Sequence, residues 1–398
     1  MWIDPFHLTY CSNIHSGEEW RTVFGMLRHA LPAVRDQLQP IQSFAIGLRL
    51  SAAAAQTLDA PAALDEFRAF LQQGDYYVPT INGFPYGAFH GTRVKERVYL
   101  PDWRSRERLE YSNRLARILV ALNDRRADLL SVSTVPGAFR DEVRSSADVD
   151  AIADNMLAHA AHLVELRDET GASVTLAIEP EPACFIETTT EAVAFFRDHL
   201  FSAQAIARHN ARSAVRLTKD DVARHLGVCL DACHMAVEFE DVAPVIRAVQ
   251  DAGITIAKVQ LSSALRVTEG NLSASPEHLL RPFADDIYLH QVVVRSSVDL
   301  TRFTDLADAL GDLAQDPDIS REWRVHFHVP IFLASMSGFE TTQSYLTEVL
   351  RVLEQERVST CLEVETYTWD VLPPEYRTTD VCTAIARELA WVRDQLMR

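Results

Sequence analysis

Short strand-like runs alternate with longer helix-like runs along almost the whole chain, and this alternation constrains the fold most strongly. Eight runs are rich in apolar and β-branched residues: 3–10, 43–50, 76–82, 129–134, 174–179, 226–231, 255–261 and 360–366. Several are nearly unbroken apolar stretches, such as VTLAIE and IAKVQL, which is typical of strands covered on both faces of a parallel sheet. Eight strand–helix units favour an α/β fold with a closed (β/α)₈ TIM barrel over an open doubly wound sheet.

The helix-like runs carry their own start and stop signals. Residues 146–170 have helical apolar spacing and stop at Gly171, a typical left-handed C-terminal residue, and residues 240–252 stop in the same way at Gly253. We expect Asp59 to cap a helix whose first turn contains Pro61. The last two helices are predicted over 341–356 and 379–397.

Two additional strand-like runs, 287–295 and 323–329, lie between the seventh and eighth barrel strands. We expect them to belong to a β-insertion, about 262–338, that covers the mouth of the barrel. Whether either run joins the barrel wall stays open at this point. Because the sequence has no repeats, low-complexity tracts or obvious linkers, we predict a single domain over residues 1–398.

The composition excludes several classes of protein. The net charge of −18, from 38 basic and 56 acidic residues, argues against a nucleic-acid or anionic-membrane partner, since both bind mainly through Lys and Arg clusters. Six cysteines without a CxxC pair make neither a disulfide scaffold nor a zinc ribbon. The N-terminus lacks the basic and apolar regions of a signal peptide, and no run is long enough for a transmembrane helix. We therefore expect a cytoplasmic protein.

Polar residues end four successive barrel strands, where the loops of a (β/α)₈ barrel build its active face. The fifth strand ends in Glu179 and Glu181, the sixth in Asp231, the seventh in Gln260, and the eighth in Glu363 and Glu365. Carboxylates crowded at one rim repel one another, and a divalent cation removes this conflict. We predict one Mn²⁺, Zn²⁺ or Mg²⁺ ion held by Glu179, Asp231, Gln260 and Glu365.

Strand alternation does not separate the two members of either glutamate pair, because residues i and i+2 point to the same side of a strand. We favour Glu179 because it directly ends the apolar run, and Glu365 because it lies nearer the mouth. The alternatives Glu181 and Glu363 stay open, as does a simple salt-bridged role for any of these carboxylates.

Histidines and loop residues form a second set of candidates. His234 lies three residues after Asp231 and can face the same cavity, so we expect it to bind substrate, together with His7 from the first strand and Asn82 after the third. His326 and His328 share one face of a strand-like run and are further substrate-binding candidates, with the role of His290 open. The loop TINGFPYGAFHG provides either an apolar wall over a ligand or a packed plug at the rim.

These residues resemble known proteins at two levels. The order Glu179, Asp231-x-x-His234, Gln260, Glu365 resembles the xylose isomerase-like TIM-barrel superfamily, which implies one divalent metal, two proton-transferring glutamates and a substrate-contacting histidine. The strings HLTYCSNIH, TINGFPYGAFHG, VYLPDW, CLDACHMAVEFED, KVQLSSA, HFHVPIF and LEVETYTWDVLP are similar to the EboE family of metabolite traffic proteins encoded in bacterial ebo gene clusters. That resemblance implies the handling of a small metabolite precursor, with other proteins of the same cluster as possible partners.

The leading hypothesis is a metal-dependent isomerase or epimerase of a small hydroxylated metabolite. The metal would polarise substrate oxygens, and Glu179 and Glu365 would act as catalytic base and acid. The alternative is a metabolite-binding or trafficking protein that keeps the barrel pocket without turnover, because one barrel fold supports many functions.

Overall fold

The computed structural model describes residues 1–39, 43–91, 93–124, 126–127, 129–269, 275–312, 321–336 and 338–397. Its larger sheet has nine strands in the order β1-β2-β15-β8-β7-β6-β5-β4-β3. All neighbours from β2 round to β3 are parallel, and β1 pairs with β2 in the antiparallel direction. An isolated parallel bridge between Cys11 and Gly47 joins the two ends, so the sheet closes into the predicted (β/α)₈ barrel.

All eight predicted barrel strands are present. Three have the predicted bounds: β4 (Tyr76–Asn82), β7 (Leu226–Asp231) and β8 (Thr255–Leu261). The others are shorter by one or more residues: β2 (Phe6–Tyr10), β3 (Phe44–Arg49), β5 (Leu130–Thr134), β6 (Val174–Ile178) and β15 (Cys361–Val364). The first predicted strand is divided, because the chain turns at Asp4-Pro5 between β1 (Trp2–Ile3) and β2.

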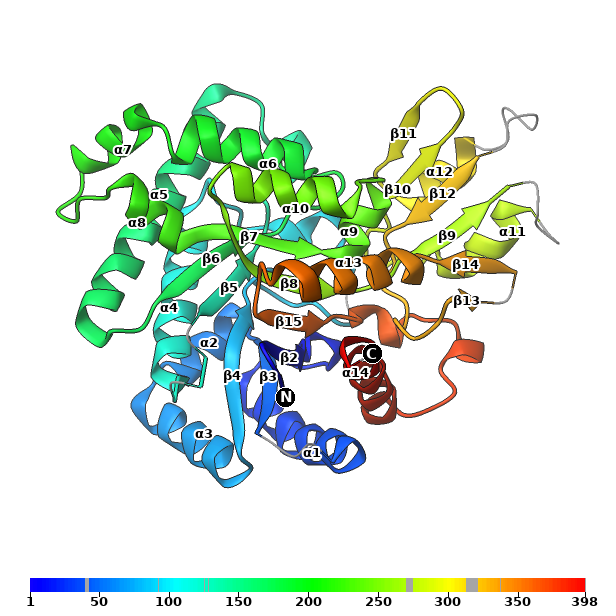
Figure 1. Ribbon diagram of the computed structural model, residues 1–398, viewed down its shortest axis with the longest axis horizontal. Coiled ribbons are helices and arrows are strands. Elements are labelled where there is room, and N and C mark those ends of the chain that lie inside the picture. The colour runs from blue at the N-terminus through cyan, green and yellow to red at the C-terminus, as the bar shows by residue number, and fades with distance from the viewer. Residues whose placement is uncertain are drawn as a thin grey trace.

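Helices surround the barrel strands (Figure 1). The first half of the chain supplies α1 (Trp20–Leu38), α2 (Ala52–Leu58), α3 (Pro61–Gln73), α4 (Arg106–Leu122) and α5 (Ser146–Thr170). The second half supplies α6 (Thr189–Phe195), α7 (Ala203–Asn210), α8 (Lys219–His225), α9 (Ala232–Val237), α10 (Val242–Asp251), α13 (Gln343–Glu356) and α14 (Val381–Leu396). Within the described part of the chain, no helix has the length and apolarity needed to cross a bilayer.

The structure confirms the helix end predicted at Gly171 and contradicts the helix cap predicted at Asp59. Helix α5 has the predicted bounds, and Gly171 caps it with a φ of 75°, a left-handed conformation that costs glycine little. Asp59 does not cap α3. The N-cap is Ala60, because the residue before a proline is pushed into an extended conformation, and Asp59 instead ends α2.

The segment between β8 and β15 forms a second, antiparallel sheet in the order β11-β10-β12-β9-β14-β13. This sheet lies beyond the carboxyl ends of β7, β8 and β15, at the right of Figure 1. Neither of the two strand-like runs joins the barrel wall. The elements of the segment between β8 and β15 are β9 (Leu265–Thr268), α11 (Pro276–Leu280), β10 (Val292–Arg295), β11 (Leu300–Phe303), α12 (Leu306–Asp312), β12 (Glu322–Val325), β13 (Ser335–Met336) and β14 (Phe339–Thr341).

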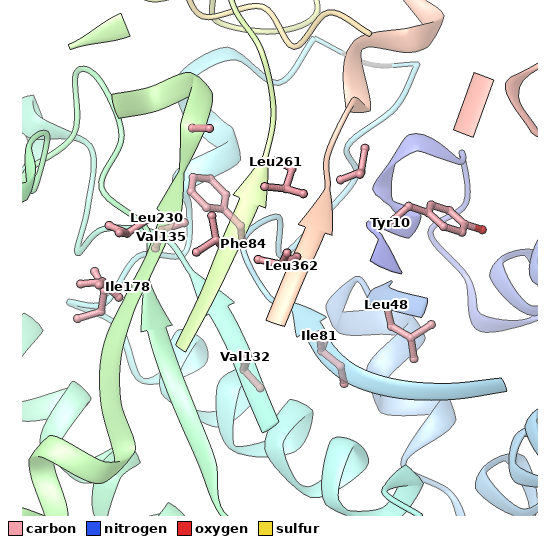
Figure 2. Close-up of a cluster of buried hydrophobic side chains, with 14 of the residues drawn as sticks. Tyr10, Leu48, Ile81, Phe84, Val132, Val135, Ile178, Leu230, Leu261 and Leu362 are labelled. Carbon is pink, nitrogen blue, oxygen red and sulfur yellow. The ribbon is translucent and has the colours of Figure 1, made fainter. Parts of the chain in front are cut away.

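The two faces of the barrel strands differ sharply in polarity. One set of strand side chains packs with the helices in a large hydrophobic core, and Figure 2 shows Leu48, Ile81, Val132, Ile178, Leu230, Leu261 and Leu362 among them. The alternate residues meet inside the barrel and are small or polar: Ser131 Oγ lies 2.9 Å from Thr80 Oγ1, and Lys258 Nζ lies 3.2 Å from Ser133 Oγ. The barrel interior is therefore a polar column below the active face.

Candidate active site

The carboxyl ends of four barrel strands bring the central polar side chains together. Asn82 ends β4, Glu179 follows β6, Asp231 ends β7 and Glu365 follows β15. Asp231 also begins α9, because its Oδ1 accepts a hydrogen bond from the backbone N–H of His234 at 3.0 Å. This cap turns the chain directly from strand into helix and brings the His234 side chain back over the strand end.

Three carboxylates face one another at this end of the barrel. Glu179, Asp231 and Glu365 are each at most 4% exposed, and one oxygen from each lies within 4.8 Å of the other two. Glu179 Oε2 and Asp231 Oδ2 accept no hydrogen bond from any described residue. Unpartnered buried oxygens of this kind are costly, so the group fits a divalent cation and its oxygen ligands. We refer to these three residues as the carboxylate group.

The pKa values of the carboxylate group reflect this crowding. Burial, followed by the charges of Glu365 and Asp231, raises the pKa of Glu179 well above its usual value. Burial and the Asp231 charge do the same to the pKa of Glu365. Burial alone would raise the pKa of Asp231, but the nearby His234 and His328 and a hydrogen bond from Ser262 lower it. Two of the three groups thus resist ionisation unless positive charge is supplied.

Glu365 is held more firmly than Glu179. Its Oε1 accepts hydrogen bonds from Asn13 Nδ2 at 2.7 Å and from Asn82 Nδ2 at 2.9 Å. Asn82 is itself fixed, because its Oδ1 accepts from the backbone N–H of Phe84 at 3.0 Å. Amide groups that donate to a carboxylate in this way orient it as a metal ligand.

The alternative glutamate, Glu363, lies deeper in the barrel. Its Oε1 forms a close ion pair with Lys258 Nζ, and both side chains are fully buried. A Cβ atom at Gly47 would lie 1.5 Å from Glu363 Oε2, so only glycine fits there. Lys258 thus points into the barrel and pairs with Glu363 below the carboxylate group.

Gln260 lies beside this deeper pair. Its Cα is paired with both Asp231 and Glu363 in the sheet, and its Oε1 accepts a hydrogen bond from Cys229 Sγ at 3.3 Å. These contacts place the Gln260 side chain in the barrel interior. Its role as a fourth metal ligand stays a prediction.

Three histidines form a second group beside the carboxylates. His326 Nε2 lies 3.1 Å from His234 Nε2 and 3.2 Å from His328 Nε2. The predicted strand that carries His326 and His328 is shorter than expected, since β12 ends at Val325 and the chain then runs into the barrel mouth. His290, whose role was left open, lies outside this group. Its Nε2 lies 2.5 Å from Asp285 Oδ2, and its Nδ1 lies 3.0 Å from the backbone carbonyl oxygen of His326.

Glu181, the alternative to Glu179, belongs to the histidine side of the site. Its Oε1 accepts hydrogen bonds from the Tyr99 hydroxyl at 2.8 Å and from Gln291 Nε2 at 3.3 Å. Gln291 in turn places its Oε1 2.6 Å from His326 Nδ1. Glu181 is therefore fully engaged in positioning, whereas Glu179 keeps an oxygen without a partner among the described residues.

A pocket opens above both groups, and its upper wall is aromatic. Phe89, from the glycine-rich loop after β4, packs against Tyr288 of the insertion and Tyr367 after β15, with ring centroids 5.2 and 5.3 Å away. Backbone hydrogen bonds from Val94 and Lys95 to the Ile287 carbonyl join the loop to the insertion. The polar lining consists of Asn13, Asn82, Lys95, Tyr99, Glu179, Glu181, His234, His326 and Glu365.

One predicted site residue lies elsewhere. His7 is at the opposite end of the barrel, because its Cα pairs with Cys361 at the start of β15, and its Nδ1 lies 3.0 Å from the Tyr77 hydroxyl. The prediction that His7 binds substrate is therefore dropped. Asn13 was not predicted as a site residue, although it follows the first barrel strand, as the predicted residues follow theirs.

Comparisons with known proteins add little to this geometry. No protein-family model matches the chain, and no curated protein matches it. Among solved structures, a D-allulose 3-epimerase from Methylomonas sp. in complex with D-allulose is 12% identical with a TM-score of 0.49, over 98% of this chain and 97% of that chain. A 3-keto-D-glucoside 4-epimerase from E. coli is 13% identical with a TM-score of 0.46, over 98% and 99%. Likenesses this distant carry no argument about function, and the barrel described above rests on the chain's own strand pairing.

Proposed function

We propose that this protein is a metal-dependent isomerase or epimerase that acts on a small hydroxylated metabolite. The observation that carries the proposal is the carboxylate group: three buried acidic side chains within 4.8 Å, two of them with an oxygen that no described residue satisfies. Three such carboxylates repel one another without a cation, and oxygen ligands of this kind suit Mn²⁺, Mg²⁺ or Zn²⁺. Glu179, Asp231 and Glu365 would hold the ion, with Gln260 as a candidate fourth ligand.

In this proposal Glu179 and Glu365 have different roles in proton transfer. A divalent ion bound there would polarise adjacent substrate oxygens and so acidify a proton on the carbon that carries them. Glu179 is the better placed base, because its Oε2 is free to accept a proton. Glu365, whose Oε1 is held by Asn13 and Asn82, would serve as the opposing acid. The aromatic wall would keep water away from the reacting carbon.

Deuterium exchange tests the reaction directly. We would load the purified protein with Mn²⁺, Zn²⁺ or Mg²⁺ and incubate it in D₂O with a panel of sugars and cyclitols. The proposal expects deuterium at a substrate carbon, detected by NMR, and loss of that exchange in Glu179→Gln. Binding of a panel compound without any exchange would contradict the enzymatic proposal.

Binding of a panel compound without deuterium exchange is the result expected for the second candidate function. In that candidate, the protein binds or traffics a metabolite and keeps the pocket without turnover. It is favoured by the strings that resemble the EboE family, including TINGFPYGAFHG, whose Phe89 belongs to the aromatic wall of the pocket. In that case the pocket would retain a metabolite precursor, and proteins of the same gene cluster would be its partners. A cytoplasmic location and a single domain over residues 1–398 complete the proposal.

A further inference from the structure

The pocket above the carboxylate group has a single basic side chain in its lining. Among the described residues that line it, Lys95 is the only lysine or arginine, and it is buried. Its φ of 39° lies in the left-handed region that residues other than glycine rarely adopt. Hydrogen bonds from the backbone of Val94 and Lys95 to the Ile287 carbonyl hold the loop in this conformation against the insertion. The state of this one charge decides whether the pocket can accept an anionic substrate.

The positive charge of Lys95 already has a partner inside the protein. Its Nζ donates to Asp305 Oδ2 at 2.6 Å and to the Asp285 carbonyl oxygen at 3.0 Å. Asp305 is fixed in turn, because its Oδ1 accepts hydrogen bonds from the backbone N–H groups of His290 at 3.2 Å and Leu306 at 2.9 Å. The Lys95 and Asp305 side chains are only 8% and 18% exposed. This ion pair therefore leaves Lys95 without a net charge to offer a phosphate or carboxylate.

Lys95 nevertheless keeps one hydrogen atom for a substrate. An ammonium group has three N–H donors, and Asp305 and Asp285 accept two of them. No other described residue accepts from Nζ, and Lys95 lines the pocket. One donor without a net charge suits a hydroxyl or carbonyl oxygen. A phosphate group, in contrast, is bound through several charge-assisted hydrogen bonds.

The acidic side chains of the lining add negative charge. Glu181 accepts hydrogen bonds from Tyr99 and Gln291, which supply donors but no positive charge. A divalent cation would offset two of the three charges of the ionised carboxylate group. A phosphate ester adds about 1.5 to 2 negative charges at pH 7, so in this pocket it would be repelled by like charge.

We propose that the pocket selects an uncharged hydroxylated substrate over its phosphate ester, and that Asp305 sets this selection by neutralising Lys95. Lys95 binds a hydroxyl or carbonyl oxygen of the substrate through its remaining N–H. Asp305 does not touch the substrate and acts only through Lys95. The inference rests on the proposed function, because it names the substrate class of the same pocket.

Pairs of compounds that differ only in a phosphate group test the selection. We would titrate the Mg²⁺-loaded protein with myo-inositol and myo-inositol 1-phosphate, and with D-fructose and D-fructose 6-phosphate, by isothermal titration calorimetry. At pH 8 a histidine with an ordinary pKa adds no charge to the pocket. In at least one pair, the wild type should bind the uncharged compound at least about tenfold more tightly than the phosphate ester.

Two aspartate variants with the same change in charge locate the origin of the selection. Asp305→Asn frees the charge of Lys95, so it should bind the phosphate ester more tightly and reduce the preference by about tenfold or more. Asp308→Asn changes an exposed residue of the same region, in α12, and should keep the wild-type preference. A purely structural role of Asp305 would weaken the binding of both compounds and would not produce this gain.

Three results would overturn the inference: a phosphate ester that binds the wild type as tightly as its uncharged partner, an unchanged preference in Asp305→Asn, or no binding by either pair. The comparison within the wild type needs no variant, so it decides the matter even if Asp305→Asn does not fold. The proposed function fails separately. Binding of the uncharged compound without deuterium exchange contradicts the reaction and leaves the selection intact, whereas exchange on a preferred phosphate ester does the reverse.

Discussion

Replacing Lys258 with methionine should destabilise the protein strongly at neutral pH and weakly in mild acid. Lys258 and Glu363 form an ion pair inside the barrel, and both side chains have no exposed surface. Burial alone would lower the pKa of Lys258, but the Glu363 carboxylate raises it well above the usual value, so the lysine is charged. Methionine keeps much of the side-chain volume but removes the positive charge and the hydrogen bond to Ser133 Oγ.

The loss of stability in Lys258→Met depends on whether Glu363 stays charged without a partner or takes up a proton. An unpaired buried charge costs about 3–5 kcal/mol. Protonating Glu363 instead costs about 3.7 kcal/mol at pH 7, because a glutamic acid in the unfolded chain has a pKa near 4.3 and each unit is worth about 1.4 kcal/mol. The cheaper response sets the loss at about 3–4 kcal/mol at pH 7 and at about 1 kcal/mol at pH 5.

Urea unfolding followed by tryptophan fluorescence measures both values, on protein stripped of metal so that ligand binding does not add to stability. The double variant Lys258→Met/Glu363→Gln removes both charges, and it should recover most of the loss at pH 7 and show no extra dependence on pH. A loss that is equal at pH 5 and pH 7, or a double variant less stable than Lys258→Met, would refute the ion-pair reasoning.

Two further predictions concern the surroundings of the carboxylate group. Burial raises the pKa of Glu388 in α14 to about 7, whereas a glutamic acid in the unfolded chain has a pKa near 4.3. The protonated side chain therefore contributes its full stability below pH 4, and this stability is lost as the pH rises to 7. The free energy of unfolding of the wild type relative to Glu388→Gln should therefore fall by roughly 3 kcal/mol between pH 4 and pH 8 in urea titrations, and a constant difference would count against the shift. Asn82→Ala removes one of the two amide donors to Glu365 and should weaken Mn²⁺ binding about 10- to 100-fold in competition with a chelator, whereas unchanged affinity would mean that Glu365 is not a ligand.

The barrel could be predicted from the sequence because its strands are chemically distinctive. The apolar runs of β4, β7 and β8 gave their bounds correctly, since strands buried on both faces leave few polar interruptions. The division of the first strand and the early end of β12 were missed. Both depend on where the chain turns, which local composition specifies weakly.

The candidate site was partly predictable for the same reason. Strand-end positions identified Asp231 and both glutamate pairs, but alternation alone did not separate Glu363 from Glu365. Depth separates them: Glu363 meets Lys258 inside the barrel, and Glu365 meets Asn13 and Asn82 at the rim. These are contacts between residues up to 352 positions apart in the chain, and no local pattern encodes them.

The hydrogen bonds that orient the histidine rings were beyond sequence reasoning as well. The Nδ1 atoms of His234 and His328 donate to the backbone carbonyls of Pro180 and Glu365, so they depend on the folded path of the chain rather than on residue type. The sequence predicted these histidines as substrate-binding residues, and that role stays a prediction. It did not indicate that the Nε2 atom of each lies close to that of His326, at 3.1 and 3.2 Å.

The most direct test of the central claim is the binding of Mn²⁺, a cation that prefers carboxylates, measured by electron paramagnetic resonance in three proteins. The wild type should bind one Mn²⁺ at the carboxylate group, and Glu365→Gln should lose it while keeping the wild-type circular dichroism spectrum. Glu388→Gln, which neutralises another buried glutamate outside the group, should bind Mn²⁺ as the wild type does. If Glu365→Gln and Glu388→Gln both retain the wild-type affinity, Glu179, Asp231 and Glu365 do not hold a metal ion.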